Sequence, residues 1–127
     1  MAEATLKGRR VLVAEDEYML ADDLRQALEN EGAVVLGPVP HLEDVLALVG
    51  QHAQIDAAVL DVNLGGEMVW PAADLLSGRG VPFLLTTGYE HSSIPARHAH
   101  VTRCEKPVAP AEIVRALARE IQAHAAA

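Results

Sequence analysis

The stretch Asp56-Ala-Ala-Val-Leu-Asp-Val-Asn-Leu-Gly-Gly66 decides how this chain folds. An apolar run with the composition of a buried strand leads directly into a carboxylate, Asp61, and is stopped by Asn63 and the Gly65-Gly66 pair. Open α/β sheets place their chemistry in the crevice outside the carboxyl ends of parallel strands. We therefore predict that Asp61 lies at the functional edge of such a sheet.

A second apolar run, Val11 to Ala14, also ends on acids, the triplet Glu15-Asp16-Glu17. Taken alone, this triplet is equally typical of the first turn of a helix, where the helix dipole favours negative charge. If both runs are parallel strands of one sheet, however, the acids meet Asp61 at the same edge. Clustered carboxylates repel one another unless a cation lies among them, and Mg²⁺ prefers oxygen ligands. The sequence therefore predicts a Mg²⁺ site.

Length and composition limit the class of protein. The 127 residues predict a single domain, residues 1–127 with a core at about 10–122 and no output domain. Ten basic and eighteen acidic residues give a net charge of −8 without a basic stripe, so we expect no binding to nucleic acid. No run approaches the roughly 18 apolar residues of a membrane helix, and we expect no membrane association. The single cysteine, Cys104, suits a cytoplasmic location.

Strand-like apolar runs alternate with segments of helical period along the chain. This alternation predicts the α/β class, a doubly wound parallel sheet of five βα units with right-handed crossovers. Pro71 is expected in the first turn of its helix, and Pro95 with two serines predicts that any helix between residues 90 and 100 is short or irregular. The predicted strands are 10–14, 33–36, 55–60, 81–86 and 101–104, and the predicted helices are 17–31, 41–51, 67–79 and 109–124.

Two further strands bring polar groups to the same edge. The fourth ends on Thr86-Thr87-Gly88 and the fifth on Lys106-Pro107. Acids, a hydroxyl and an ammonium around one Mg²⁺ are typical of a phosphoryl-transfer site, in which the centrally placed Asp61 is the natural nucleophile. Strand alternation is expected to turn Thr86 away from the site, which favours Thr87 as the hydroxyl.

These motifs, in this order, resemble the receiver domain of bacterial response regulators over nearly the whole chain. The resemblance implies a flavodoxin-like fold with strand order 2-1-3-4-5 and a phosphoryl group accepted on Asp61. It implies that Thr87 and Lys106 assist catalysis, and that the Lys106–Pro107 bond is usually cis. The metal ligands that it implies are Glu15, Asp16, Asp61 and the backbone carbonyl of Asn63.

The segment Leu85-Thr-Thr-Gly-Tyr-Glu90 is similar to the Phe-Ala-Thr-Gly-(apolar)-Tyr motif of the FAT GUY subgroup of receivers, with Leu85, Thr86 and Glu90 departing from it. Several members of that subgroup are stand-alone proteins of phosphorelays or stress signalling, with output through the fourth-strand loop. Many receivers also carry an aromatic switch residue three positions before the lysine, where this chain has Arg103. We therefore expect switching through Thr87, Gly88 and Tyr89, with Arg103 in place of the aromatic residue.

Other classes of function remain as alternatives. A phosphohydrolase of the haloacid-dehalogenase type would need a second aspartate two positions after the nucleophile as general acid, and this position is Asn63. A receiver-like scaffold that works without phosphorylation is disfavoured by the complete acidic set. A zinc site at His91, His98 and His100 near Cys104 lacks the paired ligand spacing of such sites.

The resulting expectation is a stand-alone response regulator of a two-component system or phosphorelay. Its partners would be a histidine kinase or histidine phosphotransferase and a downstream protein. It would not be an enzyme with a separate substrate, although it would assist its own phosphorylation and dephosphorylation.

Overall fold

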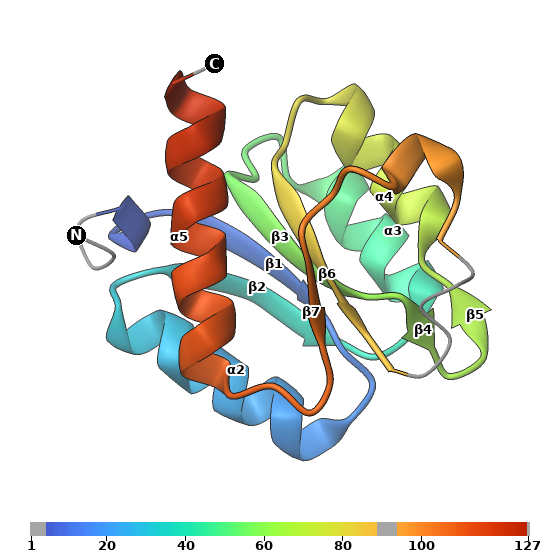
Figure 1. Ribbon diagram of the computed structural model, residues 1–127, viewed down its shortest axis with the longest axis horizontal. Coiled ribbons are helices and arrows are strands. Elements are labelled where there is room, and N and C mark those ends of the chain that lie inside the picture. Colours follow the sequence, from blue (N-terminus) through green and yellow to red (C-terminus); the bar gives the residue numbers. More distant parts are fainter. Residues whose placement is uncertain (1–4, 89–93, 127) are drawn as a thin grey trace.

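A five-stranded parallel sheet forms the middle layer of the molecule (Figure 1). The computed structural model describes residues 5–88 and 94–126. The order β2-β1-β3-β6-β7 is the order 2-1-3-4-5 when these five strands are counted along the chain, so the predicted fold class and topology are confirmed. The strands are β1 (Arg10–Ala14), β2 (Val34–Val39), β3 (Ala57–Asp61), β6 (Phe83–Thr87) and β7 (Arg103–Glu105).

Helices cover both faces of this sheet (Figure 1). One face packs against α2 (Tyr18–Asn30) and α5 (Pro110–Ala126), and the other against α3 (Leu42–Gln51) and α4 (Trp70–Gly78). Alternate strand residues enter the two cores, as a period of two requires. Leu12, Leu60 and Leu85 face α3 and α4, whereas Val11, Val59 and Leu84 face α2 and α5.

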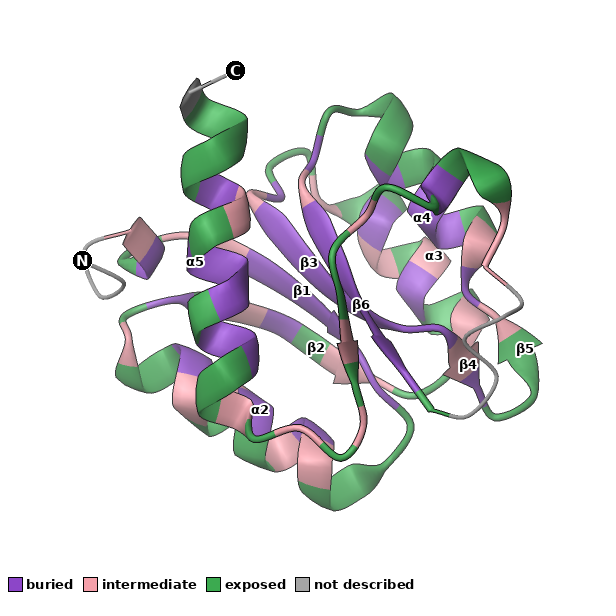
Figure 2. Cartoon of the chain, in the orientation of Figure 1, coloured by how far each residue is buried: buried purple, intermediate pink, exposed green. Residues whose placement is uncertain are grey.

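The two central strands that carry the predicted site are buried along their whole length. Every residue of β3 and β6 is classed as buried, and these strands are purple throughout in Figure 2. Fully burying one Leu or Val side chain stabilises the fold by roughly 1.5–3 kcal/mol. A slip of β3 by one residue would exchange its two faces. The packing of β3 therefore fixes the position of Asp61, its last residue.

Strand β2 is longer than the sequence predicts. We expected it to end at Leu36, before Gly37-Pro38, but it continues to Val39 through a cis Gly37–Pro38 bond, with a shift of register against β1. The proline is tolerated because β2 is an edge strand, where a missing N–H need not interrupt a ladder. A Cβ at Gly37 would lie 2.9 Å from the carbonyl oxygen of Val13, so only glycine fits this close approach.

The helix predicted from residue 67 starts later. Residues 67 and 68 belong to an antiparallel hairpin of β4 (Asn63–Leu64) and β5 (Glu67–Met68), and α4 begins at Trp70. Gly65 and Gly66 both have positive φ, which the tight two-residue turn between the strands requires. Pro71 lies in the first turn of α4, as predicted.

The described residues 94–100 contain one 3₁₀ turn, Ala96–His98, and no helix longer than this turn. It is held to α4 by His98, which is buried. The His98 Nε2 atom lies 2.8 Å from Asp74 Oδ1, and its ring stacks on Trp70 with the centroids 5.7 Å apart. Arg97 also binds both Asp74 carboxylate oxygens. Within the described ranges, no helix has both the length and the apolarity needed to cross a bilayer.

Candidate functional site

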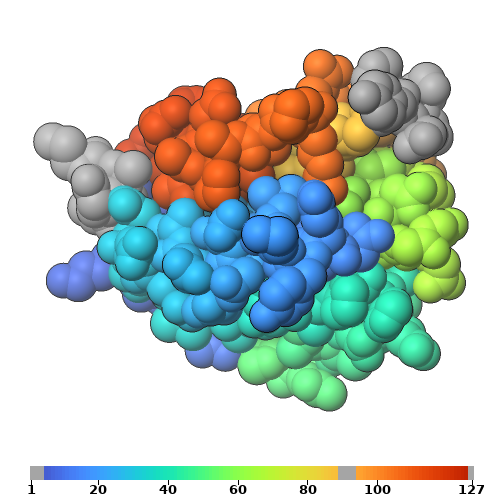
Figure 3. All heavy atoms as spheres, turned by 90° about the horizontal axis from the view of Figure 1, so that it is seen from below, coloured from blue at the N-terminus to red at the C-terminus, as the bar shows by residue number. Residues whose placement is uncertain are grey.

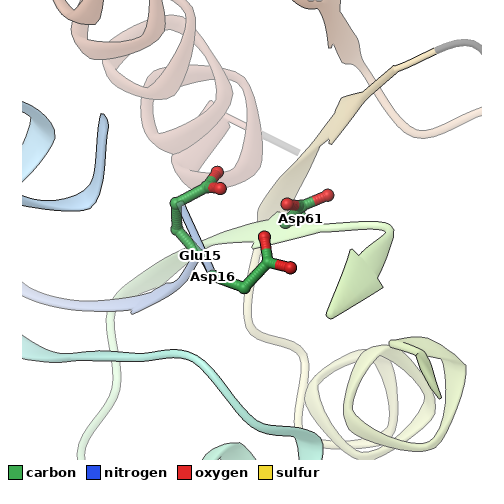
Figure 4. A group of neighbouring side chains, drawn as sticks. All are labelled: Glu15, Asp16 and Asp61. Atoms are coloured by element: carbon green, nitrogen blue, oxygen red, sulfur yellow. The ribbon is translucent and has the colours of Figure 1, made fainter. Parts of the chain in front are cut away.

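Three carboxylates meet at the carboxyl ends of β1 and β3 (Figure 4). Glu15 and Asp16 directly follow β1, and the parallel pairing of Ala14 with Leu60 places them beside Asp61. One oxygen of each carboxylate lies within 4.8 Å of the others. Glu15 and Asp61 are buried, with 4% and 5% of their surface exposed, whereas Asp16 is open to solvent. The structure therefore brings the two acidic motifs together, as predicted.

Lys106 reaches the same cluster from β7. Its Nζ atom lies 3.0 Å from Oε2 of Glu15 and 3.0 Å from Oδ2 of Asp61. The backbone directs it there, because β7 pairs with β6 and the Lys106 N–H donates to the carbonyl oxygen of Thr87 at 2.8 Å. The bond to Pro107 is cis, as the resemblance implies. One ammonium thus faces three carboxylates, which leaves the cluster net negative.

The pKa of Asp61 is raised from 3.8 to about 7. Burial is the main cause and the charge of Glu15 adds to it, while the hydrogen bond from Lys106 opposes them. Burial lowers the pKa of Lys106, but its hydrogen bonds to Asp61 and Glu15 outweigh that effect and the pKa is raised. An additional cation would relieve both the burial of charge and the repulsion between the acids.

Backbone N–H groups orient each acid. Asn63 N–H donates to Asp61 Oδ1 at 3.2 Å, Gly65 N–H donates to Asp16 Oδ2 at 2.9 Å, and Glu17 N–H donates to Glu15 Oε2 at 3.0 Å. The Asn63 side chain accepts the Gly66 N–H at 2.6 Å and so closes the β4–β5 turn. The resemblance implies a role for Asn63 only through its backbone carbonyl, as a metal ligand. The β4–β5 hairpin beside the acids was not predicted from the sequence.

Two threonine hydroxyls lie unpartnered at the end of β6. Thr86 and Thr87 are each 1% exposed, and neither Oγ1 atom has a hydrogen-bond partner among the described residues. Buried hydroxyls nearly always find a partner, so an unpaired one is available to an incoming acceptor. Since hydrogen bonding does not distinguish the two, the choice of Thr87, made from strand alternation and from the resemblance, stays a prediction.

Two hollows open beside the cluster. One, of about 530 Å³, is lined by Lys106, Gly88 and Met19 among others, and the second, of about 400 Å³, by Glu15, Asp16 and Tyr18 among others. Figure 3 views the molecule from below, with the start of α2 in blue and the region that follows β7 in orange. Tyr18 and Met19, the first two residues of α2, are 81% and 73% exposed. Lys106 thus lines one surface hollow, and Glu15 and Asp16 line the other.

The remaining predicted residues lie away from the acids or outside the description. Arg103 is exposed, and its Nη2 donates to the carbonyl oxygen of Ala99 at 3.1 Å. Tyr89 and His91 lie outside the described residues. His98 is bound to Asp74, and within residues 5–88 and 94–126 only Glu15, Asp16 and Asp61 form a metal-sized group. The described part of the chain does not assemble the alternative zinc site.

Comparison with known proteins shows the family. No family model matches the chain. The crystal structure of a CheY-like response regulator receiver domain protein from Methanospirillum hungatei JF-1 shares the fold, with a TM-score of 0.80 at 21% identity, over 94% of this chain and 98% of that one. The solution structure of SdrG from Sphingomonas melonis Fr1 is 33% identical, with a TM-score of 0.77, over 91% of this chain and 97% of that one. The chain belongs to the response-regulator receiver family.

Curated relatives of this receiver are longer. The uncharacterized transcriptional regulatory protein YbdJ of Bacillus subtilis is 27% identical over 123 residues, which is 94% of this chain and 53% of that protein. The transcriptional regulatory protein PdtaR of Mycobacterium tuberculosis is 28% identical over 90 residues, 70% of this chain and 43% of that protein. The receiver thus spans about half the length of the curated relatives it matches.

Proposed function

We propose that this response regulator accepts a phosphoryl group on Asp61 from a histidine kinase or histidine phosphotransferase, in a Mg²⁺-dependent reaction. One observation carries the proposal. Asp61 ends the central strand in a buried position, within 4.8 Å of two further carboxylates and 3.0 Å from the ammonium of Lys106. A carboxylate that only caps a strand end needs no further acids beside it. A pKa raised to about 7 is typical of functional sites.

The chemistry follows from these groups. An Asp61 carboxylate oxygen attacks the phosphorus of a phosphohistidine, a new P–O bond forms, and the P–N bond breaks with its electron pair returning to the imidazole. The product is an acyl phosphate. Lys106, which already contacts Asp61, donates a hydrogen bond to the added phosphoryl oxygens, and the unpartnered hydroxyl of Thr87 donates a second one.

The donor set fits Mg²⁺. Glu15, Asp16 and Asp61 offer oxygen ligands, the carbonyl of Asn63 is proposed to add a fourth, and the exposure of Asp16 leaves room for water ligands. Bound Mg²⁺ would neutralise negative charge on the carboxylates and on the transferring phosphoryl group. Without it, Glu15 and Asp61 share the ammonium of Lys106, and Asp16 accepts the Gly65 N–H.

Signalling by this receiver is proposed to run through contacts with a protein target in the cytoplasm, without nucleic acid or a separate substrate. Membership of the FAT GUY subgroup, and with it a role in a phosphorelay or in stress signalling, belongs to the same proposal and rests on the motif from Leu85 to Glu90. Because the curated relatives are longer than this chain, the signalling output is proposed separately from the phosphoryl transfer to Asp61.

Phosphoryl uptake tests the proposal. The protein is incubated with acetyl phosphate and either Mg²⁺ or EDTA, and hydroxylamine-sensitive phosphate is measured. We expect uptake of one phosphoryl group that requires Mg²⁺. No uptake from acetyl phosphate or from an active histidine kinase would favour the scaffold. Repeated turnover of a phosphate ester such as p-nitrophenyl phosphate would instead favour the phosphohydrolase.

A further inference from the structure

A polar pocket, separate from the two hollows beside the acids, lies at the opposite end of the sheet. It has a volume of about 210 Å³, and its lining includes His100, Glu120 and His124. His100 precedes the first residue of β7, whereas Glu15 and Asp16 follow the last residue of β1 and Asp61 is the last residue of β3. Figure 1 shows α5 running from the level of the acid-bearing strand ends to the C-terminus at the other end of the molecule. The site of phosphoryl transfer does not use this pocket.

The fold brings these three side chains together from two segments. Glu120 and His124 are four residues apart on α5, so they project from the same face of the helix. Thr102 ties the segment before β7 to that face, because its Oγ1 donates to Glu120 Oε2 at 2.8 Å. His100, two residues earlier, lines the same pocket.

The surroundings favour a cation. The pocket lies by the last turns of α5, where the helix dipole is negative, and none of its described lining residues is lysine or arginine. The chain as a whole carries a net charge of −8. Two imidazoles and one carboxylate are a ligand set for Zn²⁺ and similar transition-metal ions, whereas Mg²⁺ and Ca²⁺ select oxygen ligands.

We propose that His100, Glu120 and His124 bind a divalent transition-metal ion of the zinc class. Their ligand atoms are not gathered within 4.8 Å, a condition that only the acidic cluster meets in residues 5–88 and 94–126. Binding therefore requires rotation of the His100 and His124 side chains, both of which are exposed. The Thr102 bond occupies Glu120 Oε2 and so presents Oε1 to the ion.

This site differs from the histidine cluster suggested by the sequence. His98 points instead to Asp74 and packs between Trp70 and Phe83, so it is not available as a partner of His100. A bound ion would join the segment before β7 to the end of α5. The segment held in this way is the one that follows the 3₁₀ turn Ala96–His98.

Zinc binding to the full, untagged chain tests the proposal. Zn²⁺ is titrated against a chromophoric chelator in excess Mg²⁺, which keeps the acidic cluster occupied. We compare the wild type with His100→Ala, Glu120→Gln and His124→Ala, and with His41→Ala as a matched control, since His41 is an exposed histidine at the start of α3. Thermal unfolding of each variant in EDTA checks that the fold is retained.

The wild type and His41→Ala should bind one Zn²⁺ and melt at a higher temperature with it. Each pocket variant should lose most of this affinity, and Thr102→Val should weaken binding about tenfold through loss of the outer hydrogen bond to Glu120. Wild-type affinity in His124→Ala, equal losses in His41→Ala and His124→Ala, or a loss confined to His91→Ala would each overturn the proposal.

Discussion

Lys106 Nζ lies 3.0 Å from Oδ2 of Asp61, so the proposed phosphoacceptor is already in contact with the cation proposed to stabilise its product. The same ammonium lies 3.0 Å from Glu15. Phosphorylation would add negative charge on the Asp61 side of this bridge. We therefore expect Lys106 to link the phosphorylation state of Asp61 to the positions of β7 and of the segment that precedes it.

Replacing Lys106 tests this link. Lys106→Met removes the hydrogen bond and charge that hold the pKa of Asp61 down, so this pKa should rise above about 7. Uptake from acetyl phosphate at neutral pH should fall at least about tenfold, because loss of a charge-stabilising donor costs more than that in comparable sites. Lys7→Met, at an exposed lysine, serves as control. Equal uptake rates in the two variants would remove Lys106 from the mechanism.

The raised pKa of Asp61 also predicts how stability depends on pH. Between 3.8 and about 7 the folded protein holds a proton on Asp61 that the unfolded chain has released. The free energy of unfolding therefore falls as pH rises through this range, and the loss persists above it. Asp61→Asn cannot titrate, so in EDTA at pH 8 its free energy of unfolding should exceed that of the wild type, by roughly 4 kcal/mol at most, the equivalent of the full pKa shift.

Urea unfolding of both proteins from pH 4 to pH 8 measures this difference. The gap in unfolding free energy between Asp61→Asn and the wild type should widen with rising pH, and most of the change should occur below pH 7. A gap that is constant over the whole range would show that Asp61 is ionised normally.

Mg²⁺ should stabilise the wild type by binding only to the folded state. Asp16→Ala removes the most exposed of the three carboxylates, whose present partner is the Gly65 N–H. We expect millimolar Mg²⁺ to raise the melting temperature of the wild type and to leave that of Asp16→Ala unchanged. Asp44→Ala, at an exposed aspartate of α3, should respond like the wild type. Equal shifts in all three proteins would place Mg²⁺ elsewhere.

The switch is predicted to run through residues 87–100. Thr87 and Lys106 should move toward the added phosphoryl group, and in the described part of this range His98 contacts Asp74 and Trp70 of α4. Hydrogen exchange with and without a beryllofluoride mimic should therefore change most between residues 87 and 100, a range that includes Tyr89. Changes restricted to α2 and α5 would contradict this prediction.

The sequence predicted the parallel α/β sheet and the acidic cluster because both follow from strong local patterns, whereas the strand order was implied by the resemblance to receiver domains. The buried strand β3 ends on Asp61, and Glu15 directly follows the buried strand β1. It missed the β4–β5 hairpin, because two residues per strand are too few to show a period, and Glu67 and Met68 suit a helix equally well. The continuation of β2 past Pro38 was missed because a proline ends most strands, and the edge position that tolerates it here is not visible in the sequence.

The pocket lined by His100, Glu120 and His124 also could not be predicted from the sequence. His100 was grouped with His91 and His98 because they are close in the chain. The structure instead places His100 with Glu120 and His124, which lie on α5. Contacts between distant segments of this kind leave no local pattern to detect.

The central claim is that Asp61 is the phosphoacceptor, and intact-mass spectrometry with peptide mapping tests it most directly. Wild type, Asp61→Asn and the control Asp44→Asn are each treated with acetyl phosphate and Mg²⁺. The account predicts one hydroxylamine-sensitive phosphoryl group on the wild type and on Asp44→Asn, mapped to Asp61, and none on Asp61→Asn. Labelling of Asp61→Asn to the wild-type extent, at any other residue, would contradict it.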